Sequence, residues 1–168
     1  FPEGDWLLNL EWETRFSNAI YAVAFSPDGD ILATGDRDQK VRLWRASDGE
    51  LLNIIEDLAS VRSLAFSPDT HLLASASEDT IRLWQVSDGE LVGEMQGHSD
   101  RITEIAFSPD GQVLVSASVD GTVKLWDING SLLANLTGHT AGVNDLAFFQ
   151  DGRRLVTGSA DGTIWLWG

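Results

Sequence analysis

Few side chains in this sequence could carry out chemistry. There is no Cys, which excludes disulfides and thiolate metal sites, and there are three His. His71 lies in the turn Asp69-Thr70-His71, where we expect it to be exposed, and a lone His does not make a metal site. No glycine-rich phosphate loop is present. We therefore expect no metal and no cofactor.

A repeated pattern must position whatever site the chain contains. The phrase AFSPDG or a close variant returns at a constant step of 41 residues, at Phe25, Phe66, Phe107 and Phe148. A second phrase closes on Leu-Trp, at Trp44, Trp84, Trp126 and Trp167. A fixed period of about 40 to 45 residues is typical of repeat architectures.

Each repeat is predicted to form four short strands. In the third repeat we expect strands at Ile102–Phe107, Val113–Ala117, Thr122–Asp127 and Leu132–Leu136. The turn Ser108-Pro109-Asp110-Gly111 separates the first two, because Pro pre-sets φ at the second turn position and Gly tolerates a positive φ. The other first strands are expected at Ile20–Phe25, Val61–Phe66 and Val143–Phe148. No stretch carries a sustained helical period, so the chain is predicted to be all-β.

Two repeats depart from this pattern. The second has Glu78-Asp79-Thr80 where the third has Asp120-Gly121-Thr122, which predicts a turn one residue tighter. The fourth stops at Gly168 without a fourth strand, whereas residues 6–10 match the fourth strand of the first repeat. We predict that the segment over 6–10 completes the last sheet, because an unpaired strand edge needs a cover.

Composition excludes several kinds of partner. A net charge of −15 opposes attraction to nucleic acid or anionic lipid, so we expect neither partner. No apolar run approaches the roughly 18 residues of a membrane span, and no signal-peptide pattern opens the sequence. We therefore expect a cytoplasmic protein. Since the sequence opens on Phe1 rather than Met, we expect a processed, excised or engineered segment.

The chain resembles the WD-repeat β-propellers over essentially its whole length. The matching elements are the SPDG turns, the stretch 116–120, and a list of short motifs: Gly97-His98, Gly138-His139 and Leu125-Trp126-Asp127. Trp44-Arg45 and Trp84-Gln85 depart from the Trp-Asp pair. The resemblance implies one all-β domain over 1–168, a β-propeller of four-stranded antiparallel blades at about 16–57, 58–96, 97–137 and 138–168.

The resemblance also implies a hydrogen-bonded tetrad of His, Ser or Thr, Asp and Trp within a blade. The third blade would use His98, Ser116, Asp120 and Trp126, and the fourth His139, Thr157, Asp161 and Trp167. Such a set resembles a hydrolase triad, but a nucleophile needs an exposed hydroxyl and an oxyanion hole. These groups would instead be buried and satisfy one another. We expect a structural role and no enzyme activity.

Other positions vary between blades. Blades one and two lack the His, with Phe16 and Asp57 near its place, and are expected to be less rigidly tied. The position two before the Trp holds a long basic side chain, expected on an outer, wet strand, at Arg42, Arg82 and Lys124. Blade four has Trp165 there, and we predict an aromatic contact between it and Trp6 or Trp12; the alternative is an exposed Trp without such a contact.

Four blades are fewer than this family usually has, and an open arc would expose an apolar face at each end. We expect two chains to form one eight-blade ring, in which the N-terminal strand of each completes the last blade of the other. The seam residues would be Trp6, Leu8, Leu10, Trp12 and Trp165. The competing possibility is a monomer closed with four blades.

Members of the family mostly act as scaffolds whose partners dock on the narrow top face. Carried over by register, the top-face positions are Ala19, Tyr21, Arg37, Ser60, Arg62, Glu78, Arg101, Thr103, Val119, Gly142, Asn144 and Ala160. Of these we single out Tyr21, Arg37, Arg62, Glu78, Arg101, Thr103 and Asn144. Arg offers a rigid fork of donors for carboxylate or phosphate, which favours an acidic or phosphorylated peptide. Alternatively, these Arg pair with Glu78 and nearby Asp side chains.

Two functions remain in competition. The leading hypothesis is a non-enzymatic, homodimeric platform for an unknown protein or peptide partner. The second is an excised or engineered half-propeller whose only activity is self-assembly. An enzyme has little support, because the sequence offers no metal cluster and no exposed nucleophile with a base.

Overall fold

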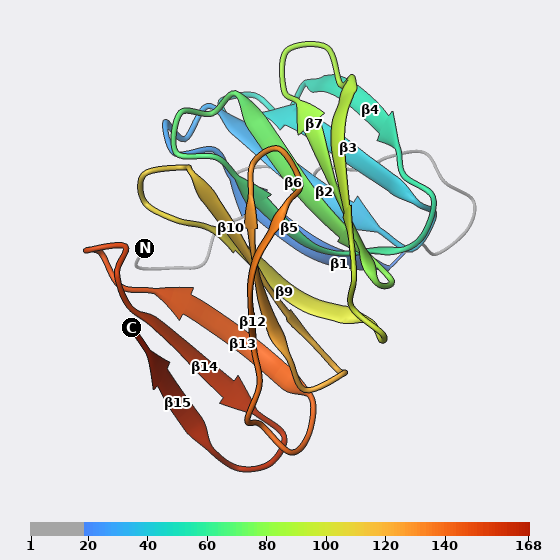
Figure 1. Ribbon diagram of the computed structural model, residues 1–168. Helices are drawn as coiled ribbons and strands as arrows, with labels where there is room; N and C mark the ends of the chain where they lie inside the picture. The colour runs from blue at the N-terminus through green and yellow to red at the C-terminus, as the bar shows by residue number, and fades with distance from the viewer. Residues whose placement is uncertain (1–18) are drawn as a thin grey trace, which may run out of the picture.

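A computed structural model describes residues 19–168 of the chain. It consists of four antiparallel sheets that follow one another along the sequence, and it contains no helix in the described part (Figure 1). The predicted all-β fold is therefore confirmed. Three sheets have four strands and the last has three, each in sequential order.

The strands are short. The first sheet contains β1 (Ile20–Phe25), β2 (Ile31–Asp36), β3 (Lys40–Arg45) and β4 (Leu51–Glu56). The second contains β5 (Val61–Phe66), β6 (Leu72–Ser77), β7 (Thr80–Gln85) and β8 (Leu91–Gln96). The third contains β9 (Ile102–Phe107), β10 (Val113–Ser118), β11 (Val123–Asp127) and β12 (Leu132–Leu136). The last contains β13 (Val143–Phe148), β14 (Leu155–Ser159) and β15 (Ile164–Trp167).

The sequence located these strands closely. All four first strands have the predicted bounds, while β10 runs one residue further and β11 begins one residue later than expected. The tighter turn of the second repeat is also confirmed. Ser77 pairs directly with Thr80, whereas in the third sheet the last regular pair is Ala117 with Val123. Glu78 takes a positive φ of 51° to make this two-residue connection.

In the first three sheets a Ser-Pro-Asp turn closes the hairpin between the first two strands by side-chain hydrogen bonds. In the third sheet the Ser108 hydroxyl donates to Asp110 at 2.6 Å, and the backbone N–H of Val113 donates to the Ser108 oxygen at 3.0 Å. Gly111 follows with a φ of 71°, which Gly adopts without steric cost. The turn chemistry therefore sets the register of β9 against β10 locally.

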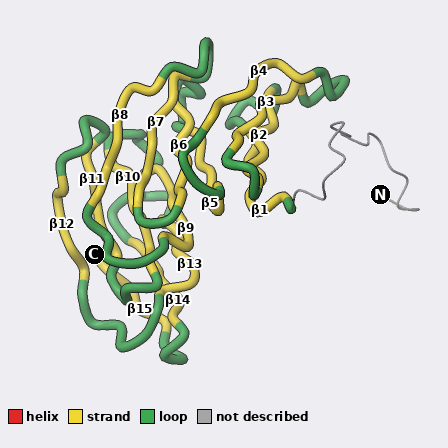
Figure 2. Tube along the Cα trace, turned by 90° about the vertical axis from the view of Figure 1, so that its right-hand side faces the viewer, coloured by secondary structure: helices red, strands yellow, loops and turns green. Residues whose placement is uncertain are grey.

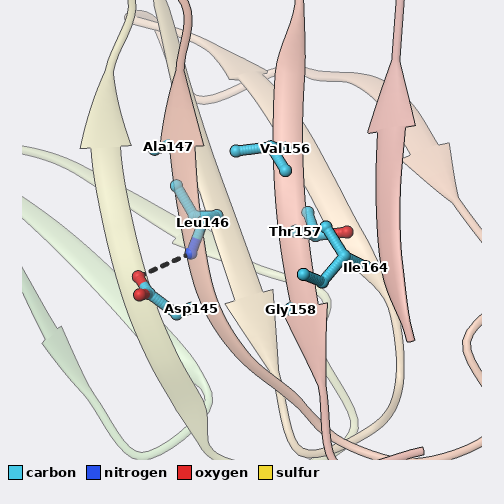
Figure 3. A pocket seen from close by; sticks show the side chains of 7 residues that line it. All are labelled: Asp145, Leu146, Ala147, Val156, Thr157, Gly158 and Ile164. Carbon is cyan, nitrogen blue, oxygen red and sulfur yellow. Dashed lines mark hydrogen bonds between the residues drawn. The ribbon is translucent and has the colours of Figure 1, made fainter. Parts of the chain in front are cut away.

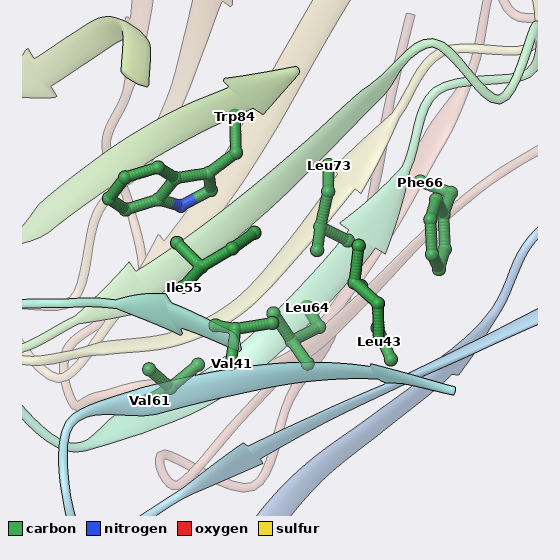
Figure 4. Close-up of a cluster of buried hydrophobic side chains, with 9 residues drawn as sticks. Val41, Leu43, Ile55, Val61, Leu64, Phe66, Leu73 and Trp84 are labelled. Carbon is green, nitrogen blue, oxygen red and sulfur yellow. The ribbon is translucent and has the colours of Figure 1, made fainter. Parts of the chain in front are cut away.

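Neighbouring sheets pack face to face. First strands contact one another in series, β1 with β5, β5 with β9 and β9 with β13, and they lie along one side of the molecule (Figure 2). The first cluster between sheets contains Val41, Leu43, Ile55, Val61, Leu64, Phe66, Leu73 and Trp84 (Figure 4). Equivalent clusters lie between the second and third sheets and between the third and the last. The core is thus three inter-sheet layers.

Gly35 shows how tightly these layers fit. A Cβ atom added to Gly35 would lie 2.5 Å from Cγ1 of Val61 on the next sheet. Gly93 is a useful contrast, because an added Cβ would meet Leu83 at an ordinary 3.7 Å.

We expect Gly35→Ala to destabilise the protein by about 1–3 kcal/mol, because overpacking forces the two sheets apart. Urea-induced unfolding would measure the loss, with Gly93→Ala as the matched control expected within about 0.5 kcal/mol of wild type. Equal stability of the two variants would contradict this account of the packing.

Candidate interaction surface

The tetrad of the third sheet is fully hydrogen-bonded. His98 contacts Asp120 through Nδ1 at 2.8 Å and Ser116 through Nε2 at 2.8 Å. The Trp126 indole N–H donates to the Ser116 oxygen at 2.9 Å, so the Ser116 hydroxyl is free to donate its own proton to Nε2. A neutral imidazole with its proton on Nδ1 satisfies every group.

The last sheet repeats this arrangement. His139 contacts Asp161 at 3.0 Å and Thr157 at 2.8 Å, and the Trp167 indole donates to the Thr157 oxygen at 3.0 Å. Hydrogen bonds from the Thr163 hydroxyl, and secondarily from backbone N–H groups, lower the pKa of Asp161 against the opposing effect of burial.

The electrostatics of the third tetrad suit a structural role. Burial lowers the pKa of His98, and its contact with Asp120 only partly opposes this. Burial also acts to raise the pKa of Asp120, but hydrogen bonds from Thr122, the Ser99 backbone N–H and His98 lower it to about 2. Ser116 is completely buried. Its oxygen accepts the Trp126 indole N–H, and its hydroxyl donates to Nε2 of His98. Within the described residues this trio offers no exposed nucleophile.

In the second sheet a different residue stands in the place of the His. Asp57 is buried at the His position and accepts hydrogen bonds from Ser75 at 2.6 Å and Ser77 at 2.9 Å. Its carboxylate also pairs with Arg82 at 2.6 Å. Ser75 in turn accepts the Trp84 indole N–H at 2.8 Å. A buried carboxylate thus provides the acceptors in place of the His in this blade, and a less rigid tie at its outer loop stays a prediction.

The basic side chains two before the Trp are buried, which corrects the expectation of a wet strand. Arg42, Arg82 and Lys124 are 5%, 6% and 7% exposed. Each finds a partner: Arg42 with Asp36, Arg82 with Asp57 and Glu94, and Lys124 with Asn135. The sequence feature that could have predicted this burial is an acid or amide within reach of each basic residue across a hairpin.

Trp165 takes the corresponding place in the last sheet. Its ring lies 5.1 Å from the His139 ring and 5.1 Å from the Trp167 ring, centroid to centroid. It therefore covers the tetrad of its own sheet. The predicted partners Trp6 and Trp12, the seam residues Leu8 and Leu10, and Phe16 lie outside the described residues, so the seam contact stays a prediction.

The top-face positions do gather at one end of the sheets. Backbone hydrogen bonds join Arg37 to Ala19, Val119 to Arg101 and Ala160 to Gly142, each at 2.9 or 3.0 Å. Contacts between sheets continue the row. The Ser60 hydroxyl donates to the Arg37 carbonyl at 3.1 Å, and the Ile102 N–H donates to the Glu78 carbonyl at 2.7 Å. The loops thus form one continuous rim.

Three Arg side chains stand on this rim. Arg37 and Arg101 are exposed, and the Arg62 guanidinium stacks on the Tyr21 ring at 4.8 Å. None of the three forms an ion pair with any residue in the described range 19–168, although Glu78 is exposed nearby. The alternative in which these Arg are neutralised by local acids is not observed in this part of the chain.

Two further predicted top-face positions, Thr103 and Asn144, differ in whether the side chain is free to contact a ligand. The Thr103 hydroxyl donates to the Val143 carbonyl at 2.6 Å, so it links two sheets rather than pointing to a ligand. Asn144 is exposed. Across residues 19–168 no group of three or more His, Asp or Glu side chains could hold a metal ion, and no helix could cross a membrane.

Comparison with known proteins agrees with this architecture. The model "WD domain, G-beta repeat" matches residues 89–127 and 130–168, and the model "Anaphase-promoting complex subunit 4 WD40 domain" matches 23–102. The crystal structure of the computationally designed Ika4 protein is 33% identical, with a TM-score of 0.83 and 98% of each chain covered. The chain belongs to the WD-repeat family.

Other WD-repeat proteins are longer than this one. The crystal structure of the RRP9 WD40 repeats has a TM-score of 0.85 at 26% identity, covering 90% of this chain and 48% of that one. The small ribosomal subunit protein RACK1y of Oryza sativa subsp. japonica is 35% identical over 78 residues, 45% of this chain. That match spans 23% of the length of RACK1y.

The Asp57 network of this WD-repeat protein can be tested by deletion. We expect Asp57→Ala to lower the free energy of unfolding by about 3 kcal/mol, because it leaves the buried Arg82 charge with Glu94 as its counter-ion and the Ser77 hydroxyl as its other hydrogen-bond partner. Glu56→Ala is the matched control: it removes an exposed ion pair with Lys40 and should cost less than about 1 kcal/mol. Chemical denaturation measures both, and equal losses would contradict the assignment.

The lowered pKa of His98 predicts a loss of stability in acid. Because the unfolded chain protonates this His near 6.5 while the folded protein resists protonation, its contribution is present above that pH and is lost as the pH falls below it. Urea unfolding from pH 7.5 to 5.5, a range of about one unit on either side of 6.5, should show the decline. His98→Gln should flatten the slope and the exposed His71→Gln should not; an unchanged slope in His98→Gln would refute the prediction.

Proposed function

We propose that this WD-repeat protein is a non-enzymatic interaction scaffold that assembles as a homodimeric eight-blade ring and binds an acidic or phosphorylated peptide on its top face. The observation that carries the binding proposal is the row Arg37, Arg62 and Arg101. These side chains share one rim and have no ion-pair partner among the described residues.

The chemistry of the rim favours an anionic ligand. A guanidinium presents paired donors that match a carboxylate or phosphate, and stacking on Tyr21 holds Arg62 in place. The chain as a whole is strongly acidic, with a net charge of −15. That charge repels anionic partners elsewhere on the surface, so the Arg row would be the favourable place for them to dock.

The relatives support protein partners in general. RACK1y is a protein of the small ribosomal subunit, which is an assembly. By extension we propose a protein partner for this chain, with neither nucleic acid nor membrane, and a cytoplasmic location.

A second candidate function is self-assembly alone. The similarity to the designed Ika4 protein covers 98% of both chains, so a unit of this size occurs in a designed protein. In this alternative the ring forms and the rim binds nothing.

The rim is tested with an array of short Glu- and Asp-rich peptides, printed with and without phosphoserine. We expect binders whose affinity, measured by titration calorimetry, falls about tenfold or more in Arg62→Ala and in Arg101→Ala, because each change removes a charge-assisted hydrogen bond. Arg153→Ala is the matched control, since this exposed Arg lies on the turn after β13, at the opposite end of the sheets. Unchanged affinity in both rim variants would end the top-face proposal and leave self-assembly.

A further inference from the structure

The three layers between sheets share one layout. In each, the first strand of a sheet inserts its apolar side chains against the second and third strands of the preceding sheet. Val61 packs against Gly35 in the first layer. The corresponding positions are Ile102 with Ala76 in the second layer and Val143 with Ala117 in the third, and all four side chains are buried. A small residue thus faces a β-branched one in every layer.

Among residues 19–168 no other sheet covers the outer face of the last sheet. The position equivalent to Gly35 is Gly158, and a Cβ atom added there would meet nothing within 4 Å. Ile164 and Leu166, which correspond to the buried Val41 and Leu43, are 78% and 61% exposed. A hollow of about 210 Å³ lies beside them, lined by Asp145, Leu146, Ala147, Val156, Thr157, Gly158 and Ile164 (Figure 3).

The first sheet is open on the opposite face. Ile20, Val23 and Phe25 are 52%, 67% and 64% exposed. Their equivalents one repeat later are Val61, Leu64 and Phe66, which form part of the first layer and are buried. The two open faces lie at opposite ends of the row of sheets (Figure 1). The outer face of the last sheet at Gly158, Ile164 and Leu166 therefore lacks a first strand packed against it in the described part of the chain, and we call it the socket. The apolar side chains of β1 lack a preceding sheet there, and we call them the insert: Ile20, Val23 and Phe25.

We infer that the outer face of the last sheet is the docking site for β1 of a second copy of this chain, with Ile20 seated over Gly158. Val23 and Phe25 then lie against the last sheet as Leu64 and Phe66 lie against the first. This inference rests on the proposed ring and assigns its interface. A fourth layer of the same layout results, and two copies related by a two-fold axis form it twice.

The repeat itself argues for this occupant. The small residue Gly158 and the β-branched Ile20 reproduce the pairing that Gly35 and Val61 make within the chain. Closing such a layer would remove the exposed Ile164, Leu166, Val23 and Phe25 from water together. The outer edge of β15 also has no strand partner in the described part of the chain. Residues 6–10 of the second copy are proposed to pair there.

Two variants separate the socket from the insert. Gly158→Arg places a charge in the socket, and the isolated chain should tolerate it because an added Cβ atom meets nothing within 4 Å and Gly158 has no left-handed φ. Ile20→Asp places the opposite charge on the insert. Each variant alone should weaken the homodimer about 100-fold or more, because both copies of the interface then bury an unpaired charge. Light scattering after size exclusion, across a dilution series, measures the mass against 18.3 kDa per chain.

Mixing the two variants gives the sharpest result. In a mixed pair, one interface is wild type on both sides and the other places the introduced guanidinium opposite the introduced carboxylate, so we expect a heterodimer from two weakly associating chains. Matched controls are Gln150→Arg, on an exposed turn of the same sheet, and Leu58→Asp, an exposed side chain between β4 and β5; both should remain dimeric. Circular dichroism of each variant checks that the β-structure is intact.

The outcomes distinguish the interface from the ring. A wild-type dimer that Gly158→Arg and Ile20→Asp leave intact would overturn this interface while the proposed homodimer stands. A wild-type monomer at every concentration would overturn both the interface and the proposed ring. Peptide binding to the rim is read separately, so its failure would not affect this test.

Discussion

A sheet that is apolar on both faces needs a neighbour on each side, and this constraint governs the whole molecule. Every layer of the core lies between two sheets rather than within one, so no blade is complete alone. Burial of apolar area is the dominant favourable contribution to folding. At the two ends of the described row of four sheets this requirement is not met, because Ile164 and Leu166 at one end and Ile20, Val23 and Phe25 at the other are exposed.

The buried polar groups of each blade must also be satisfied within these packed layers. A buried Trp indole N–H needs an acceptor in every blade, and a Ser or Thr hydroxyl provides it each time, at 2.8 to 3.0 Å. What satisfies that hydroxyl in turn varies. A neutral His does so beside Ser116, whereas the Asp57 carboxylate does so beside Ser75 and brings Arg82 into the core as its counter-ion. Buried polar groups must be paired, but several chemistries meet that requirement.

The rim and the core differ in which contacts hold their residues in place. Strand residues are held by contacts on both faces, while the loops at one end of the sheets are joined chiefly through backbone hydrogen bonds. Their side chains are consequently free to vary between blades, from Arg37 and Arg101 to Gly142 and Ala160. Recognition can therefore be specified on the loops without disturbing the scaffold, as is common when rigid elements carry functional loops.

The sequence by itself determined the strands, their order and the turns, because the SPDG hydrogen bonds and the alternation of side chains act between residues close in the chain. The resemblance to WD-repeat propellers also located the tetrads of His98 and His139, and the top-face positions were carried over from that family by register. It could not show that Asp57 replaces a His or that Arg42, Arg82 and Lys124 are buried. Those outcomes depend on groups brought together across a hairpin and between sheets, where a charge is excluded from water only once the layers have packed. Tertiary structure alone decided which apolar faces remain open, because the side chains of Ile20 and Val61 are of one kind and differ only in whether another sheet covers them.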